Sequence, residues 1–142
     1  MTAAYPAPVR SRRRAGLGLV AFIASAAALV IGMAGIWLAG FFVGRVVRLV
    51  DYPDLIQETE AQLWDTLERA IGAVIILVVA WVLHALVALW GLIQGIVATS
   101  LGRGRGWGIA AIVLASSGWM LLLAFTQHAL LAGLMGLMPF TI

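Results

Sequence analysis

Three long stretches of the chain contain no Asp, Glu, Lys or Arg: Ala15–Gly44, Ala70–Gly102 and Gly106–Ile142. A helix rises about 1.5 Å per residue, so about 20 apolar residues cross the roughly 30 Å hydrocarbon core of a bilayer. Each stretch exceeds that length. The pattern therefore predicts an all-α membrane protein with three transmembrane helices, at about residues 16–44, 70–101 and 107–128.

All six acidic residues fall between the first two stretches, in the window Asp51–Glu68. At 100° per residue most of the carboxylates lie on one side, with Trp64, Leu67 and Ile71 opposite, which predicts an amphipathic helix at about residues 53–69. It either lies on the outer membrane surface or runs straight into the second span. The favoured interpretation is a solvated polar face. A partner interface and a weak cation site are the alternatives, but the window lacks a cation-binding loop motif.

Composition agrees with a membrane protein. Hydrophobic residues make up 63% of the chain, charged residues 11%, and the mean hydropathy is +1.07. Soluble domains hold about 25% charged residues. The length allows one helical membrane domain, residues 15–142, preceded by a disordered basic tail, residues 1–14. Cysteine and lysine are both absent, which excludes thiolate, disulfide and Schiff-base chemistry.

The arginines predict the orientation of the spans. Six lie on one side of the expected topology and three (Arg45, Arg48 and Arg69) on the other. The six are Arg10, Arg12, Arg13, Arg14, Arg103 and Arg105. Because cytoplasmic loops carry an excess of basic residues, we expect a multi-pass protein of the bacterial inner membrane with its N-terminus inside and its C-terminus outside. We interpret the first stretch as an uncleaved span, since it outlasts the apolar core of a signal peptide.

The net charge of +3 does not indicate nucleic-acid binding, because the arginines border the apolar stretches and form no patch that could follow phosphates. The bilayer is the expected partner, together with a membrane protein or a second copy of the chain. The composition suggests no metal and no cofactor.

Four polar side chains inside the apolar stretches are candidate contacts: His84, Gln94, Gln127 and His128. An ionisable group within a membrane is a functional candidate by default, as a proton relay or a ligand contact. A neutral histidine can also hydrogen-bond across helices. We favour this structural role for His84 and interfacial solvation for Gln127 and His128, since the spans contain no acidic residue to complete a proton pathway.

Small residues recur at four-residue spacing, as in Gly40-x-x-x-Gly44, Gly91-x-x-x-Gly95 and Ala132-x-x-x-Gly136. Such stripes allow close approach of helices, and intramolecular packing is the simplest interpretation. A weak internal repeat relates the starts of the first and third spans at an offset of 90 residues, with Gly16 and Gly18 matching Gly106 and Gly108.

The segment Gly91–Met120 contains an apolar helix, the turn Leu101-Gly102-Arg103-Gly104-Arg105-Gly106 and a second apolar helix. It resembles the helical hairpin of small uncharacterised polytopic membrane proteins common in actinobacteria, which carry a Pro/Arg-containing cytoplasmic tail. The resemblance covers about half the chain and excludes the acidic window. It implies a class of protein and no catalytic residues.

We therefore expect a non-enzymatic integral membrane protein that acts as a structural or accessory component. The alternative is a small oligomeric transporter or channel-like protein whose pathway is lined by His84 and Gln94. Three helices enclose a pathway poorly, so this alternative requires an oligomer.

Overall fold

The computed structural model describes residues 16–46 and 60–136. Three helices make up this part of the chain: α1 (Gly16–Val46), α3 (Glu60–Ser100) and α4 (Arg105–Leu134). All three are long and apolar enough to cross a membrane. The prediction of an all-α protein with three such helices is confirmed.

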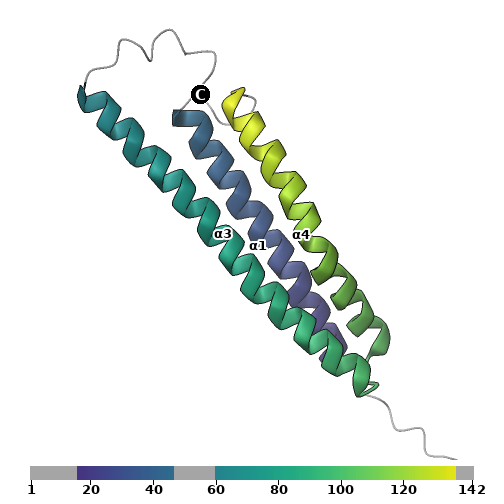
Figure 1. The fold of residues 1–142 in the computed structure, drawn as a ribbon. Helices are drawn as coiled ribbons and strands as arrows, with labels where there is room; N and C mark the ends of the chain where they lie inside the picture. Colours follow the sequence, from purple (N-terminus) through teal and green to yellow (C-terminus); the bar gives the residue numbers. More distant parts are fainter. Residues whose placement is uncertain (1–15, 47–59, 137–142) are drawn as a thin grey trace, which may run out of the picture.

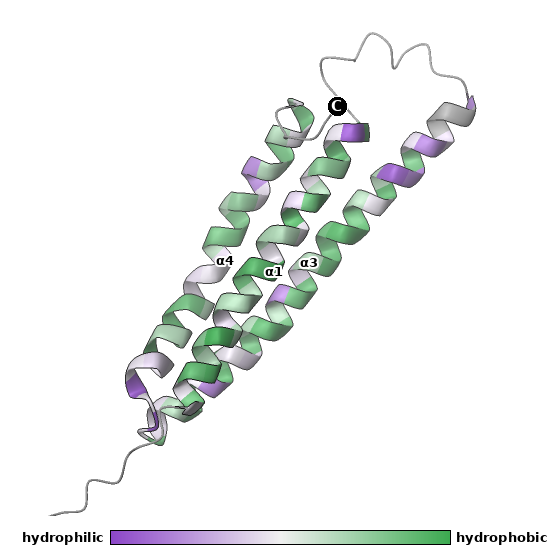
Figure 2. Ribbon diagram, turned by 180° about the vertical axis from the view of Figure 1, so that it is seen from behind, coloured by the Kyte–Doolittle hydropathy of each residue, from purple (hydrophilic) through white to green (hydrophobic). Residues whose placement is uncertain are grey.

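The helices form an elongated bundle in which α1 lies between α3 and α4 (Figure 1). The chain alternates direction, so α1 and α4 run parallel and α3 runs antiparallel to both. α1 packs along both neighbours, whereas α3 and α4 contact each other less. Figure 2 shows hydrophobic residues along the whole length of the bundle, with hydrophilic residues gathered mostly toward its ends.

The interior is built from small residues and the exterior from large ones. The buried positions of α3 in the apolar core are alanines, joined in the same stripe by His84, Gly91 and Gly95. In α4 the buried positions are glycines and alanines apart from Leu122. Val, Leu and Ile side chains are exposed on all three helices. This arrangement suits lipid, which solvates large aliphatic groups and leaves close backbone packing to join the helices.

The repeat at an offset of 90 residues corresponds to equivalent packing positions in α1 and α4. Gly18 and Gly108 are both buried, and so are Ala21 and Ala111. A methyl group added to Gly18 would collide with the carbonyl oxygen of Gly104. At the other end of the pair, a methyl group on Gly44 would lie 2.7 Å from the carbonyl oxygen of Gly133. The two parallel helices therefore approach closely at both ends.

The turn between α3 and α4 is a helix C-cap of the Schellman type. The amide of Arg103 donates to the carbonyl of Ala98 at 3.0 Å, and that of Gly102 to the carbonyl of Thr99 at 3.3 Å. Gly102 has a φ of 65° and Gly104 one of 76°. Side chains disfavour this left-handed region, so the two glycines allow the chain to reverse within a few residues.

The boundaries of the second span differ from the sequence prediction. α3 is one uninterrupted helix of 41 residues, about 60 Å long. Residues 60–69 are its first turns, so no helix separate from the span is present there; residues 53–59 lie outside the described part of the chain. The reason is that the sequence contains no helix breaker between Trp64 and Ala70. The alternative of continuation into the span is the one observed.

The first turns of α3 stand apart from α1 and α4 (Figure 1). Trp64, Leu67 and Ile71 are exposed, and nothing would touch a methyl group added to Gly72. Asp65 forms an ion pair with Arg69 on the same helix, with both side chains more than half exposed.

The third span also ends later than predicted. The sequence predicted that this span ends at about residue 128, but α4 continues to Leu134 and a turn follows, in which Gly136 has a φ of 67°. Packing explains the extension, because Gly133 lies directly against Gly40 and Gly44 of α1.

Candidate functional site

Among the described residues, His84 is the only ionisable side chain that is buried. Only 1% of its surface is exposed. Its Nδ1 atom lies 2.9 Å from the carbonyl oxygen of Ala28 on α1. A carbonyl oxygen can only accept, so Nδ1 carries the proton and donates it across the helix pair. Ala28 lies within one turn of the middle of α1, so this hydrogen bond forms near half the depth of the bundle.

Small residues make the space for the imidazole. A methyl group on Gly32 of α1 would lie 3.3 Å from Cβ of His84 and 2.7 Å from Cδ2 of Leu122. A methyl group on Gly118 of α4 would lie 3.5 Å from Cε1 of His84. The ring thus lies where all three helices meet. A methyl group on Gly32 would collide first with Leu122, whereas one on Gly118 would be in ordinary van der Waals contact with the ring.

Two tryptophans form the aromatic part of this junction. The ring of Trp119 on α4 meets the His84 ring nearly edge to face, with centroids 5.6 Å apart and an interplanar angle of 81°. Trp81, one turn before His84, lies 5.7 Å from Trp119. Offset and edge-to-face aromatic pairs are mildly attractive. Together the three rings join α3 to α4, which also pack closely near the turn, where Gly95 lies against Gly108.

The second nitrogen of His84 has no hydrogen-bond partner within residues 16–46 and 60–136. Nε2 is buried and accepts no hydrogen bond from any described residue. Because Nδ1 holds the proton of the neutral ring, Nε2 presents a lone pair. A buried acceptor without a donor costs about 1–3 kcal/mol. The unsatisfied lone pair is the chemically most distinctive feature of the bundle interior.

A cavity of about 180 Å³ lies between α3 and α4, and His84 does not line it. Its walls are Ala85, Ala88, Leu89, Leu92, Ala115 and Trp119. Ala88 is one turn beyond His84 on the same face of α3, and Trp119 belongs both to the cavity wall and to the ring contact with His84. The cavity is partly open to the surface of the bundle.

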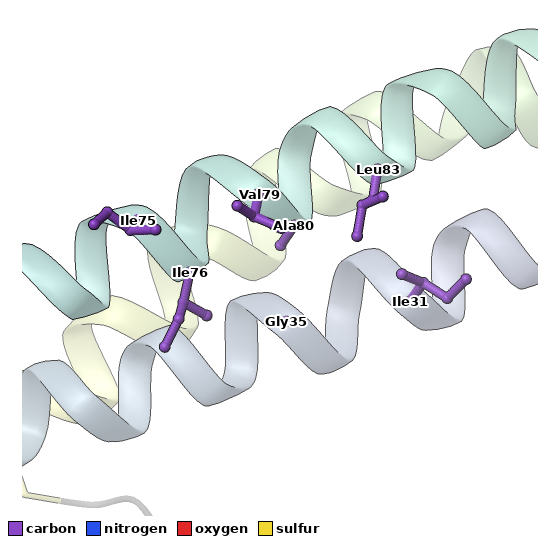
Figure 3. Close-up of a pocket in the computed structure, with 7 residues that line it drawn as sticks. All are labelled: Ile31, Gly35, Ile75, Ile76, Val79, Ala80 and Leu83. Carbon is purple, nitrogen blue, oxygen red and sulfur yellow. The ribbon is translucent and has the colours of Figure 1, made fainter.

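A second cavity, of about 220 Å³, lies between α1 and α3 and is wholly aliphatic (Figure 3). Gly35 and Ala80 approach closely within it, and Ile31, Ile75, Ile76, Val79 and Leu83 complete its lining. It offers neither a donor nor an acceptor side chain, so its surface fits hydrocarbon only.

The other predicted polar contacts do not join His84. Gln94 is half-buried, more than two turns further along α3. Gln127 and His128 are exposed on α4, where His128 Nδ1 lies 3.0 Å from the carbonyl oxygen of Ala124 in its own helix. The residues that complete the site, Trp119 and Gly118, were not singled out as contacts from the sequence. The sequence signal that could have identified these two residues was a glycine next to a tryptophan inside an apolar span.

The basic residues of the described chain lie at the ends of the helices. Arg103 and Arg105 are exposed at the α3–α4 turn. Arg45 lies at the opposite end of the bundle, with its guanidinium 5.5 Å from the centroid of the Phe41 ring. Arg10, Arg12, Arg13 and Arg14 fall outside the described residues.

Within the described ranges, no cluster of His, Asp or Glu side chains could hold a metal ion. The imidazole of His84 donates one hydrogen bond from Nδ1 to the carbonyl of Ala28 on the neighbouring helix, and its Nε2 can accept one more. Comparisons with protein families, with curated proteins and with solved structures found no match for the chain.

Proposed function

We propose that the protein is a non-enzymatic, structural or accessory component of a bacterial inner membrane, with its N-terminus in the cytoplasm. One observation carries this proposal: the faces that the three helices turn toward one another consist mainly of Ala and Gly, packed backbone to backbone. Such an interior gives a stable membrane-embedded body. A polar pathway would need hydrophilic residues along its length.

The hydrogen bond of His84 to Ala28 supports the same proposal. Polar side chains that bond across helices in a membrane stabilise their packing by about 0.6 kcal/mol on average. His84 is thus suited to fix the register between α1 and α3. The orientation rests on the arginine distribution, in which the α3–α4 turn belongs to the cytoplasmic side.

Reconstitution tests the proposal against the transporter alternative. The full chain is placed in lipid vesicles, and proton and solute fluxes are measured beside protein-free vesicles and vesicles containing a His84→Leu variant. A structural component gives the leak of the lipid alone in all three cases. A flux that the wild-type chain supports and His84→Leu abolishes would overturn the proposal.

The mass of the protein in lipid nanodiscs provides an independent test. A monodisperse monomer is incompatible with a pore, because three closely packed helices enclose no continuous pathway. A defined oligomer combined with flux would instead favour a channel. Gentle solubilisation followed by chemical cross-linking then identifies the membrane proteins that the chain accompanies.

A further inference from the structure

We propose that the protein binds one phospholipid with a primary amine in its headgroup, in the groove between α1 and the first half of α3. One acyl chain lies in the aliphatic cavity of about 220 Å³, and the headgroup meets the ion pair of Asp65 and Arg69. The inference goes beyond the accessory role. It uses the placement of the helices in a bilayer but not their orientation.

The α1–α3 cavity selects the apolar part of the ligand. Its walls are Ile31 and Gly35 of α1 and five residues of α3 between Ile75 and Leu83, and none of them has a donor or acceptor side chain (Figure 3). An apolar cavity of roughly 150 Å³ can hold benzene, so this one accommodates a segment of hydrocarbon chain. It is open to the surface of the bundle, where a membrane supplies acyl chains.

Open space continues from the cavity toward the start of α3. At 100° per residue, Gly72 is rotated by only about 20° from Val79 and from Leu83, so the three share one side of α3. A methyl group added to Gly72 would meet no described atom within 4 Å. The first turns of α3 also stand apart from α1 (Figure 1). The groove is therefore not closed above the cavity, and it leaves room for the glycerol part of a lipid.

An ion pair lies on the same side of α3, above this space. Asp65 and Arg69 pair with each other, and each is rotated by about 20° from Ile76 in the cavity wall. Both side chains are more than half exposed, so each can bind a further group.

The ion pair selects the headgroup. A guanidinium group donates to phosphate oxygens, and a carboxylate accepts from an ammonium group. A headgroup with both charges therefore complements Asp65 and Arg69 together, whereas a purely anionic one meets the carboxylate of Asp65. A primary amine is favoured over a quaternary one, because only the primary amine has N–H donors.

The length of the groove matches one leaflet of a bilayer. Leu83, the wall residue next to His84, lies near half the depth of the bundle. The distance along α3 from Leu83 to Arg69 is about 21 Å at 1.5 Å per residue. Half of a bilayer with its headgroups measures about 20–22 Å. A phospholipid with its chain end near Leu83 therefore has its phosphate at the level of Arg69.

The experiment titrates the full chain in detergent micelles with phosphatidylethanolamine, phosphatidylcholine or phosphatidylglycerol of identical acyl chains. Native mass spectrometry counts the lipids bound to each copy. We expect one phosphatidylethanolamine per chain, bound about tenfold more tightly than either of the other two lipids, the value of one hydrogen bond.

Two matched substitutions test the cavity. Val79 lines it and is half exposed, so Val79→Trp fills the cavity without entering the packed interior and should abolish the binding of one lipid per chain. Val78→Trp, at the neighbouring exposed position outside the lining, should preserve it. Equal helix content by circular dichroism shows that both variants fold.

Three further substitutions test the headgroup contacts. Asp65→Asn should lower the affinity for phosphatidylethanolamine to that for phosphatidylcholine and raise the affinity for phosphatidylglycerol, because Arg69 loses its carboxylate partner. Arg69→Gln should weaken all three lipids by about tenfold. Arg103→Gln, at the other end of α3, is the control and should change none of them.

Four results would overturn the proposal. The three lipids could bind equally, so that the ion pair selects no headgroup. Asp65→Asn could keep the preference for phosphatidylethanolamine. Val79→Trp could leave the binding unchanged, which would place the lipid elsewhere. The native mass could be that of a dimer that Val79→Trp dissociates, so that a second copy of the chain occupies the groove.

Discussion

The Nδ1 atom of His84 on α3 and the carbonyl oxygen of Ala28 on α1 lie 2.9 Å apart, near the middle of the bundle. These two residues are far apart in sequence and belong to antiparallel helices. The contact fixes the tautomer of the imidazole and the register of the helix pair together. It also leaves Nε2 as a lone pair next to Trp119.

Truncation of His84 should destabilise the bundle. His84→Ala removes the hydrogen bond to Ala28 and leaves a cavity beside Gly32 and Gly118. Large-to-small substitutions in a packed interior cost about 2–5 kcal/mol, and we expect about 2 kcal/mol here, since the unsatisfied Nε2 disappears as well. Reversible unfolding in mixed micelles measures the change. His128→Ala, at an exposed position, is the control and should change stability by less than about 0.5 kcal/mol.

The close contact between α1 and α3 should depend on Gly91. A methyl group there would lie 2.5 Å from Oγ and 3.1 Å from the amide nitrogen of Ser25. We expect Gly91→Ala to destabilise the bundle by about 1–3 kcal/mol through overpacking. Gly72→Ala on the same helix meets nothing within 4 Å and should be neutral or stabilising by up to about 1 kcal/mol. Equal effects of the two substitutions on the unfolding free energy would contradict the close contact of α1 and α3.

The α3–α4 turn should require glycine at position 102. Because Gly102 has a φ of 65°, Gly102→Ala forces a side chain into the left-handed region, at a cost of about 1–2 kcal/mol. Gly106 lies in the first turn of α4, and a methyl group added to it would meet nothing within 4 Å. Gly106→Ala should therefore not destabilise the bundle. Thermal unfolding of the two variants in the same detergent gives the comparison. A lower Tm for Gly106→Ala than for Gly102→Ala would argue against the turn.

The absence of cysteine gives a clean background for testing the orientation. Asp65→Cys places a thiol on the first turns of α3, and Ser100→Cys places one next to the arginine-containing turn. Both positions are exposed. In intact spheroplasts, a membrane-impermeant maleimide should label Asp65→Cys alone. Leu86→Cys, near mid-depth on the lipid-facing surface, serves as the unlabelled control. Labelling of Ser100→Cys instead would invert the proposed topology.

The sequence by itself determined the three membrane-length helices, because charge-free apolar stretches of that length have no other stable arrangement in lipid. It also indicated contact surfaces through Gly40-x-x-x-Gly44 and Gly91-x-x-x-Gly95, since close helix approach requires small side chains. At the end of α4, however, the buried glycine is Gly133 and not Gly136 of the predicted stripe. The sequence could not determine where α3 begins or where α4 ends. Those boundaries depend on local continuity near Trp64 and on the packing of Gly133 against α1.

The tertiary structure alone decided what surrounds His84. Periodicity places His84 and Gln94 on one helix but does not give the relative rotation and register of three helices. These depend on which glycines meet, as at Gly32, Gly118 and Gly91. The packing buries His84 against Ala28 and Trp119, and leaves Gln127 and His128 exposed. A polar residue in an apolar stretch therefore acquires its role only when backbone packing selects its neighbours.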